Sequence, residues 1–345
     1  MRHPLRRTAA TVLLLPSLLV AAATPAMAHD PAHDPAHDRD HDRDHGGRDI
    51  PATFTLFGDP DGSQFEGIDV ASDRRTFYVT ETTGGEVHRG RVDDPRTEVW
   101  LDEDDALAAG RTTAVGIATD WSGRVHIAGG GNRNEEGAPA DAPDFWVHDA
   151  DGDLLAALRM PVEGRVFLND VVVGPDGAAY VTDSVTPRIF RVALENGAWQ
   201  ATVWADAGGV INQTGTFGLN GIEVAPDRRS LVVAQSDVGA LWRFDLETEA
   251  PTRIDTGTVD LTGADGLVVK GCTLVVVRGQ AHVLTYLRLG PDATSAALLA
   301  EVATDPDRLF TTGDVAHRRL LLVDSQFDEE PPSQDSEVVV RPFRP

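Results

Sequence analysis

Short apolar runs separated by tight turns dominate the chain from residue 52 onward. The runs are two to five residues long and rich in Val, Ile and Leu, which is typical of strands and not of the 3.6-residue period of a helix. Six pairs of runs can be aligned, and each pair encloses a turn rich in Asp, Arg, Pro or Gly. The pairs are 68–70 with 76–79, 116–118 with 125–128, 171–173 with 179–181, 222–224 with 230–233, 267–269 with 273–277, and 314–315 with 320–323.

Further strands follow most pairs at regular spacing. A third strand is expected at 87–92, 145–148, 188–192, 241–246, 282–289 and 338–343, and a fourth at 97–101, 154–160, 201–204, 251–256 and 296–302. The sixth unit lacks a fourth strand, while an unassigned strand, Thr53–Phe57, precedes the first unit. We expect that strand to pair into the last unit and close a ring, which leaves no open sheet edge between the termini.

This repeat predicts an all-β fold, a six-bladed β-propeller over residues 51–345. Four strands in each unit of about 45 to 55 residues are typical of propeller blades. A β-sandwich or a β-helix is the alternative, but neither explains why the missing strand of the sixth unit stands at the other end of the chain.

The residue that opens each unit is the candidate for chemistry. We align Glu66, Thr113, Asn169, Asn220, Asp265 and Thr312 at one position, and in a propeller this position faces one mouth of the central channel. Two of the chain's six Asn residues stand there. Asn and Asp also suit strand entry for structural reasons alone, so the pattern has a purely structural alternative.

Four of these residues form a set that suits a hard cation. Glu66 and Asp265 offer carboxylates, and Asn169 and Asn220 offer amide oxygens. Ca²⁺ takes six to eight oxygen ligands, so water or substrate could complete its shell. Another divalent cation such as Mg²⁺ is possible, whereas zinc and copper are disfavoured because neither Cys nor His stands at these positions.

The first 28 residues are expected to be a signal peptide. Arg2, Arg6 and Arg7 precede an apolar run, and Ala26-Met27-Ala28 fits a cleavage site. We therefore expect a secreted protein with no membrane insertion after cleavage, and an uncleaved anchor is the alternative.

Residues 29–50 are expected to form a disordered His- and Asp-rich linker. His recurs every fourth residue from His29 to His45. Such a segment could bind Zn²⁺, Cu²⁺ or Ni²⁺ weakly, or it could be a solvated linker with no metal role.

Charge excludes one class of partner. The formal net charge is -25 at pH 7, so a nucleic-acid partner is not expected. The chain has a single cysteine, Cys272, and therefore no internal disulfide. We expect a monomer.

Several segments together resemble the SMP-30/gluconolactonase/LRE-like family, which includes relatives such as diisopropylfluorophosphatase and paraoxonase. They are Phe65-Glu66-Gly67, Leu168-Asn169-Asp170, Leu219-Asn220-Gly221 and Ala264-Asp265-Gly266. The resemblance covers residues 52–345 and implies calcium-dependent hydrolysis of lactones, esters or organophosphates. It also implies that Glu66, Asn169, Asn220 and Asp265 bind the calcium, with Asp170 as a nearby acid. A carboxylate beside the ion can take a proton from water or attack directly, and Asp265 is the candidate for that role. The alternatives are that Asp265 is only a ligand and that Asp170 only hydrogen-bonds the adjacent loop.

Two departures from the family pattern bear on substrate. Phe167 stands where sugar lactonases commonly carry Arg, which suggests a less polar ester or lactone. The sixth-unit His of phosphotriesterase relatives is replaced by Thr311-Thr312-Gly313. Thr113, Phe167 and Thr312 are the candidate substrate contacts, although small polar fillers would explain the two threonines equally well.

Three functions remain open on the sequence. The first is a secreted calcium-dependent hydrolase of the lactonase or esterase type, with Asp265 and Asp170 as the catalytic residues. The second is a non-catalytic propeller with a structural calcium that binds a ligand or protein, since a fold does not determine function. The third places the function in the His-rich segment, with the propeller as its carrier.

Overall fold

The computed structural model describes residues 50–215 and 217–344. The predicted signal peptide, and the predicted linker apart from Ile50, lie outside these residues. Within the described part, no helix is long and apolar enough to cross a bilayer.

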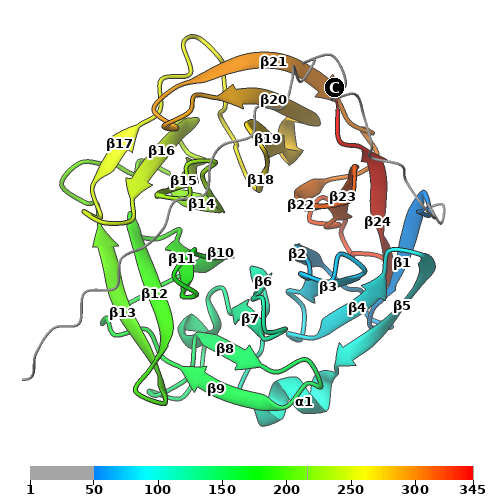
Figure 1. The fold of residues 1–345 in the computed structure, drawn as a ribbon. Coiled ribbons are helices and arrows are strands. Elements are labelled where there is room, and N and C mark those ends of the chain that lie inside the picture. The colour runs from blue at the N-terminus through cyan, green and yellow to red at the C-terminus, as the bar shows by residue number, and fades with distance from the viewer. Residues whose placement is uncertain (1–49, 216, 345) are drawn as a thin grey trace, which may run out of the picture. The chain divides into compact units, whose positions relative to one another are not determined.

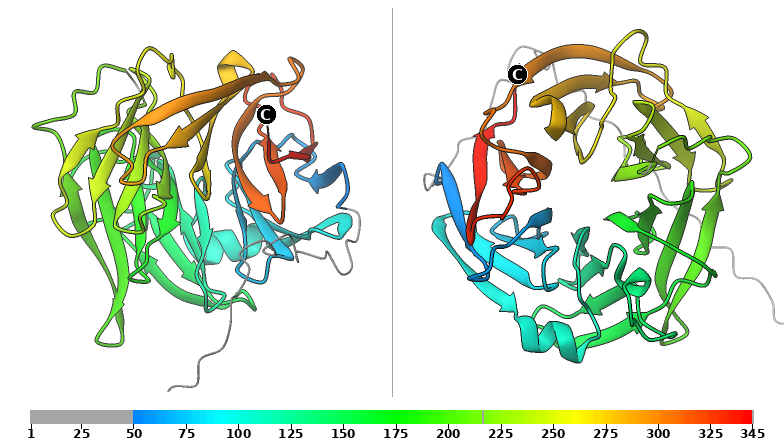
Figure 2. Two further views of the ribbon diagram at one scale, coloured as in Figure 1. Left: turned by 45° about the horizontal axis from the view of Figure 1, so that its top comes forward. Right: turned by 180° about the vertical axis from the view of Figure 1, so that it is seen from behind.

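The described residues form a ring of six four-stranded blades (Figure 1). In each blade the first strand lies innermost and its neighbours follow outward, as Figure 1 and the right-hand view of Figure 2 show. The first three blades are β2(Phe65–Val70) β3(Thr76–Glu81) β4(Val87–Arg91) β5(Asp94–Leu101), β6(Ile117–Thr119) β7(Val125–Ala128) β8(Phe145–His148) β9(Leu154–Leu158), and β10(Leu168–Val173) β11(Ala179–Asp183) β12(Arg188–Glu195) β13(Ala198–Asp206). Blades 4 and 5 are β14(Leu219–Val224) β15(Ser230–Gln235) β16(Ala240–Asp245) β17(Pro251–Arg253) and β18(Leu267–Lys270) β19(Thr273–Arg278) β20(Val283–Leu289) β21(Ala296–Ala303). Blade 6 is β22(Phe310–Ala316) β23(Arg319–Asp324) β24(Asp335–Pro342) with β1(Thr53–Phe57).

Ring closure follows the prediction. β1 pairs antiparallel with β24, from Thr53 opposite Val339 to Phe57 opposite Asp335. β1 also meets the outer strand of blade 1 through a single parallel pair, Thr55 with Arg96, so blades 6 and 1 form one continuous sheet. The six-bladed propeller and its closing strand are therefore confirmed.

The hairpin turns between first and second strands share a backbone feature. Each contains one residue with a positive φ, between 50° and 90°, a region that glycine enters without strain. These residues are Arg74, Gly123, Gly177, Arg228, Gly271 and His317. The turn chemistry of the sequence therefore marks all six inner hairpins in the described chain.

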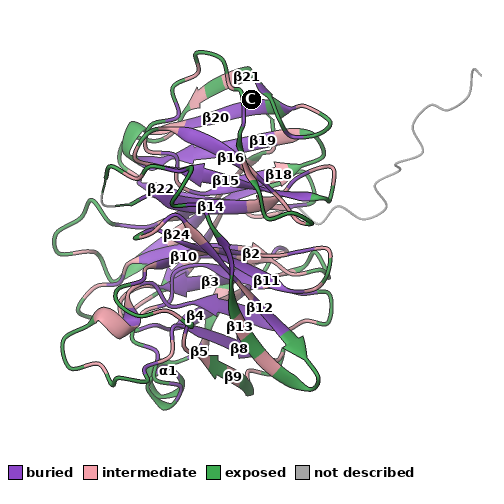
Figure 3. Cartoon of the chain, turned by 90° about the vertical axis from the view of Figure 1, so that its left-hand side faces the viewer, coloured by how far each residue is buried: buried purple, intermediate pink, exposed green. Residues whose placement is uncertain are grey.

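The core lies between neighbouring blades. Buried residues fill the inner strands, while the outer strands are the most exposed (Figure 3). One cluster combines Tyr180 and Trp204 of blade 3 with Leu231 and Phe244 of blade 4. Such packing holds the blades in fixed positions around the channel, which is a requirement for a site built from several blades.

The sequence did not predict the α-helix in the connection between β5 and β6, α1 (Glu103–Ala108). Asp102 accepts a hydrogen bond from the Asp105 backbone while the Asp105 side chain accepts one from the Asp102 backbone. This capping box uses Asp where Glu or Gln is usual, so the sequence signal is weak.

Candidate functional site at the propeller mouth

A β-bulge at the start of the inner strand positions the candidate ligands. The register of the first two strands shifts at the same place in four blades, between Phe65 and Ile68, Leu168 and Val171, Leu219 and Ile222, and Phe310 and Gly313. A bulge adds a residue to one strand and redirects its side chains. Glu66, Asn169, Asn220 and Thr311 are thus the equivalent residues of these four blades.

Hydrogen bonds between blades identify the remaining two positions. The Thr80 hydroxyl accepts from Gly67 N and donates to the carbonyl of Val115, and the Thr182 hydroxyl accepts from Asp170 N and donates to the carbonyl of Asn220. In blade 5, Asp265 accepts at its carbonyl from Gly221 N at 3.2 Å, and Gly266 N donates to Thr311 O at 2.9 Å. The ring therefore consists of Glu66, Val115, Asn169, Asn220, Asp265 and Thr311.

Two of the six aligned positions are therefore wrong. Thr113 lies two residues before the blade 2 position, which Val115 occupies, and Thr312 lies one residue after the blade 6 position, which Thr311 occupies. Apolar runs alone do not reveal a bulge, so they fix an alignment only to within a residue or two. The four predicted oxygen ligands, Glu66, Asn169, Asn220 and Asp265, do lie at equivalent positions of their blades.

Glu66 and Asp265 are close enough to oppose each other's ionisation. Burial raises the pKa of Glu66 well above its ordinary value, and the charges of Asp265 and Asp170 raise it further. Burial also raises the pKa of Asp265 to about 7, although a hydrogen bond from the Asn220 side chain opposes the rise. No Lys or Arg forms an ion pair with either carboxylate among the described residues. A buried carboxylate beside a partly buried one, without a cationic side chain, is an arrangement that a bound cation would stabilise.

The two amides have oxygens available to such a cation. The Oδ1 of Asn169 is buried and has no hydrogen-bond partner, which is costly for a polar atom unless a ligand fills the gap. Ser236 donates its hydroxyl hydrogen to Ala264 O and accepts from Asn220 Nδ2 at 3.1 Å, which leaves Asn220 Oδ1 free to bind a ligand. The four residues therefore fit a divalent cation with oxygen ligands.

Asp170 is tied to the backbone. Its Oδ1 accepts from Val171 N at 2.8 Å, and its Oδ2 accepts from Ile222 N of the next blade at 2.9 Å. Burial nonetheless raises its pKa to about 7. Its geometry is that of a carboxylate joining blades 3 and 4, and its catalytic role stays a prediction.

Three further carboxylates in the channel were not predicted. Asp69, Glu223 and Asp314 each accept a hydrogen bond from the inner strand of the following blade, at Thr119 N, Val269 N and Val70 N. Burial raises the pKa of all three, to about 8 for Asp69, and the charge of Asp314 raises the pKa of Asp69 and Glu223 further. Inner strands are sheet edges with unpaired N–H groups, and these carboxylates satisfy them. The available signal was an acidic residue within each apolar run, three residues after Glu66, Asn220 and Thr311.

Aromatic side chains line one side of the mouth. Phe167 packs edge-on against Phe217, with ring centroids 5.3 Å apart, and the Phe217 side chain is 47% exposed. Thr113 and Phe167 both flank Gly130, within 3.6 Å of where its Cβ would stand. Thr312 is 8% exposed, and its Oγ1 lies against Gly266 of blade 5. Phe167 and Thr113 are thus neighbours at the mouth, whereas Thr312 fills the joint between blades; their substrate roles stay predictions.

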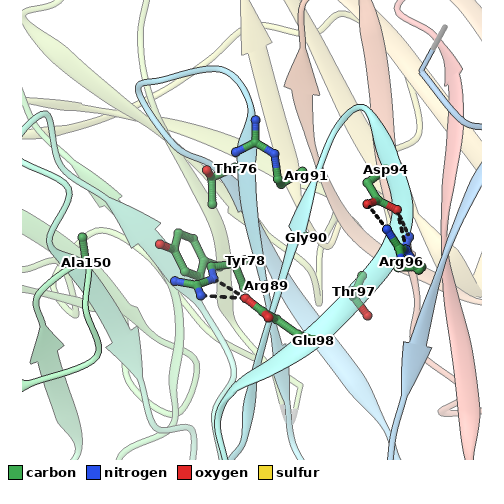
Figure 4. Close-up of a pocket in the computed structure, with 10 residues that line it drawn as sticks. All are labelled: Thr76, Tyr78, Arg89, Gly90, Arg91, Asp94, Arg96, Thr97, Glu98 and Ala150. Carbon is green, nitrogen blue, oxygen red and sulfur yellow. Dashed lines mark hydrogen bonds and ion pairs between the residues drawn. The ribbon is translucent and has the colours of Figure 1, made fainter. Parts of the chain in front are cut away.

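A surface pocket of about 610 Å³ lies elsewhere, on blade 1 (Figure 4). Its wall includes the ion pairs Arg89–Glu98 and Arg96–Asp94. The wall also includes Thr76, at the start of β3. The other end of β3, Glu81, pairs with Phe65 beside the mouth, so the pocket and the mouth lie at opposite ends of this strand. We regard the mouth as the candidate site because the pocket's charged groups already pair with one another.

Comparison with known proteins supports the fold. No protein-family model and no curated protein matches the sequence. Among solved structures, a gluconolactonase from Xanthomonas campestris is 19% identical over 84% of this chain and 89% of its own, with a TM-score of 0.57. Virginiamycin B lyase from Staphylococcus aureus is 15% identical over 79% and 81%, with a TM-score of 0.55. The Malassezia sympodialis allergen Mala s 1 is 15% identical over 84% and 96%, with a TM-score of 0.62. The chain therefore has the β-propeller fold of these proteins, among which are a gluconolactonase and a putative gluconolactonase.

Proposed function

We propose that this protein is a secreted, calcium-dependent hydrolase of lactones or esters that acts as a monomer. The observation that carries the proposal is the set of four oxygen ligands at equivalent positions of four blades, with the buried Asn169 Oδ1 lacking a partner. Gluconolactonases among the structural neighbours support hydrolysis of this bond type.

Each residue has a defined part in the proposed reaction. Glu66, Asn169, Asn220 and Asp265 would hold the cation, which when bound supplies polarisation of a carbonyl oxygen. Asp265 would accept a proton from water as the water oxygen bonds to the carbonyl carbon, or would itself attack that carbon; in both cases the C–O bond to the alcohol breaks and the alcohol oxygen takes up a proton, and in the second case water then hydrolyses the acyl–Asp265 anhydride. Beside a bound cation the Asp265 carboxyl would stay ionised, which is the form that either step needs. Asp170 holds Ile222 N and thereby keeps blade 4 and Asn220 in position.

The mouth favours a neutral, partly apolar substrate. The Phe167 and Phe217 rings offer an apolar surface to the substituent of a lactone or ester. Exposed acids on two loops, Glu135 and Glu136 on one and Asp328 to Glu330 on the other, would repel anionic substrates. Neutral lactones should therefore react faster than their carboxylated analogues, and the difference should shrink as salt is added.

The test is hydrolysis by protein stripped with a chelator and resupplied with Ca²⁺. The panel contains lactones with short and long alkyl substituents and aryl esters. We expect turnover only with Ca²⁺, and Asp265→Asn should lose about 10²-fold or more at saturating Ca²⁺, the typical contribution of a general base. Asp151→Asn, in an exposed turn, is the matched control.

Calcium binding without turnover on any panel member would reject hydrolysis. It would favour the non-catalytic propeller that binds a ligand or protein. Removal of residues 29–49 should leave turnover unchanged, because the proposed site uses none of them, and its effect on Zn²⁺ or Cu²⁺ uptake tests the separate role of the His-rich segment.

A further inference from the structure

A second group of carboxylates lies on blade 1, outside the ring at the mouth. It consists of Asp59 in the β1–β2 connection, Glu81 at the end of β3, and Glu86 directly before β4. One oxygen of each lies within 4.8 Å of the others. We refer to these three residues as the blade 1 carboxylates.

Glu86 supplies an independent sign that a ligand belongs there. Its side chain is buried, with 5% exposure for the residue, and its Oε2 has no hydrogen-bond partner. A buried carboxylate oxygen without a donor or cation is costly, and nearby negative charges increase that cost. Burial raises the pKa of Glu86 to about 7, and the charges of Glu81 and Asp59 raise it as well.

Glu81 is held in a fixed orientation toward this group. Its Oε1 accepts from Thr83 Oγ1 at 2.9 Å, and its Oε2 is 2.9 Å from His88 Nε2. His88 is itself buried against Phe65, with ring centroids 5.2 Å apart. Each carboxylate oxygen has a second lone pair, so these bonds orient Glu81 without preventing metal ligation.

Among the described residues, the blade 1 carboxylates form an ion pair with His88, through Glu81, and none with a Lys or Arg. Burial lowers the pKa of the nearby Arg111 guanidinium and the charge of Glu86 opposes this effect, but Arg111 donates to Gly85 O at 2.6 Å and lies 3.2 Å from His148. Asp59 is exposed, so the group is open to water on one side.

We propose that Asp59, Glu81 and Glu86 bind a second divalent cation, and that calcium is the preferred ion. Three carboxylates with an open side for water suit Ca²⁺, which accepts irregular shells of six to eight oxygens, better than Mg²⁺, which requires a near-octahedral one. His88 is engaged with Glu81, so the available ligands are oxygens, which disfavours zinc and copper.

The position of the site gives the ion a structural role. Asp59 follows β1, the strand that closes the ring, while Glu81 and Glu86 belong to the inner part of blade 1. A cation bound to all three joins the β1–β2 connection to the β3–β4 loop and so strengthens ring closure. This role is independent of the hydrolysis proposed for the mouth.

The experiment is equilibrium Ca²⁺ binding to the full, chelator-treated protein by titration calorimetry, with the melting temperature recorded at each calcium concentration. Glu86→Gln keeps the size of the side chain and should remove one class of sites or weaken it at least about tenfold, because it removes a charge and a ligand oxygen. Asp59→Asn is exposed and should fold normally, and it should weaken the same class. Glu98→Gln, which alters the exposed ion pair with Arg89 on the same blade, is the matched control and should bind as the wild type does.

Site-specific loss separates this proposal from the function of the mouth. Asn169→Ala should weaken the other class of sites and leave the blade 1 class intact. Unchanged stoichiometry and affinity in both Glu86→Gln and Asp59→Asn would overturn the proposal, whatever the outcome of the hydrolysis assay. Retained binding with only the melting temperature lowered would also overturn it, because a bridging water and not a cation would then satisfy Glu86.

Discussion

Replacement of Asp265 by Asn should change stability in opposite directions with and without calcium. In the metal-free protein, burial and the charge of Asp170 raise the pKa of Asp265 from 3.8 to about 7. At about 1.4 kcal/mol for each pKa unit, the ionised group lowers the free energy of unfolding by up to about 4 kcal/mol at pH 8. Asp265→Asn removes that charge at nearly constant shape.

The metal-free variant should therefore be more stable than the wild type at pH 8. The gain is smaller than the full 4 kcal/mol, because the hydrogen bond from Asn220 loses a charged acceptor, worth about 1 kcal/mol or more. At pH 5 the wild-type carboxyl is largely protonated and the gain should fall to less than half. With Ca²⁺ at 100 times the dissociation constant, the wild type gains about 2.7 kcal/mol that the variant largely loses, so the order of stability reverses.

Urea unfolding with a chelator and with Ca²⁺, at pH 5 and pH 8, measures all four values. Asp151→Asn should behave like the wild type throughout. The reasoning is refuted if Asp265→Asn lowers the free energy of unfolding by the same amount with and without Ca²⁺. In that case the ionised Asp265 neither destabilises the metal-free protein nor binds calcium.

Three further predictions concern the closing strand β1, the carboxylates in the channel, and the close contact between the inner strands of blades 4 and 5. Phe54→Ala should lower the free energy of unfolding by about 3–5 kcal/mol, because Phe54 is fully buried and contacts Phe77, and a calorimetric melt that shows a much smaller loss would contradict this. Metal-free protein should lose stability as pH rises from 5 to 8, since burial raises the pKa of Asp69 to about 8 and the native state keeps a proton that the unfolded state has already released; a flat or rising profile is the contrary result. Gly221→Ala should cost about 1–3 kcal/mol and weaken calcium binding, because its Cβ would stand 2.5 Å from the Asp265 carbonyl oxygen, whereas Gly209→Ala, with open space around it, should be neutral in the same binding assay.

The fold was predictable because each level of the sequence indicates the same structure. Apolar runs gave the strands, the turn residues gave the hairpins, and the displaced strand at Thr53–Phe57 gave the closure that β1 makes with β24. Helix α1 was missed because its cap uses Asp102 and Asp105 in place of the common residue pair.

The site was predictable only in part. Glu66, Asn169, Asn220 and Asp265 could be predicted as candidate ligands because each is a polar residue that opens one of the repeats. The offset at Thr312 arose because a bulge, which depends on contacts with the neighbouring strand, shifts the register of β22. The offset at Thr113 arose because apolar runs alone fix an alignment only to within a residue or two.

Residues brought together by the blades were harder to find. Asp69, Glu223 and Asp314 lie far apart in the sequence and share the channel only once the ring closes. The blade 1 carboxylates likewise need the β1–β2 connection to meet the β3–β4 loop. Their proximity is a property of the closed ring and not of any local pattern.

The initial rate of lactone hydrolysis as a function of free Ca²⁺, measured for the wild type and Asn169→Ala, tests the central proposal most directly. Asn169 contributes a neutral ligand and no reacting group, so the variant should reach a similar maximal rate but need at least about tenfold more Ca²⁺, since each ligand contributes to affinity. A hydrolytic rate that does not depend on Ca²⁺ in either protein, or no hydrolysis with Ca²⁺ bound, would contradict the assignment of the mouth as a calcium-dependent active site.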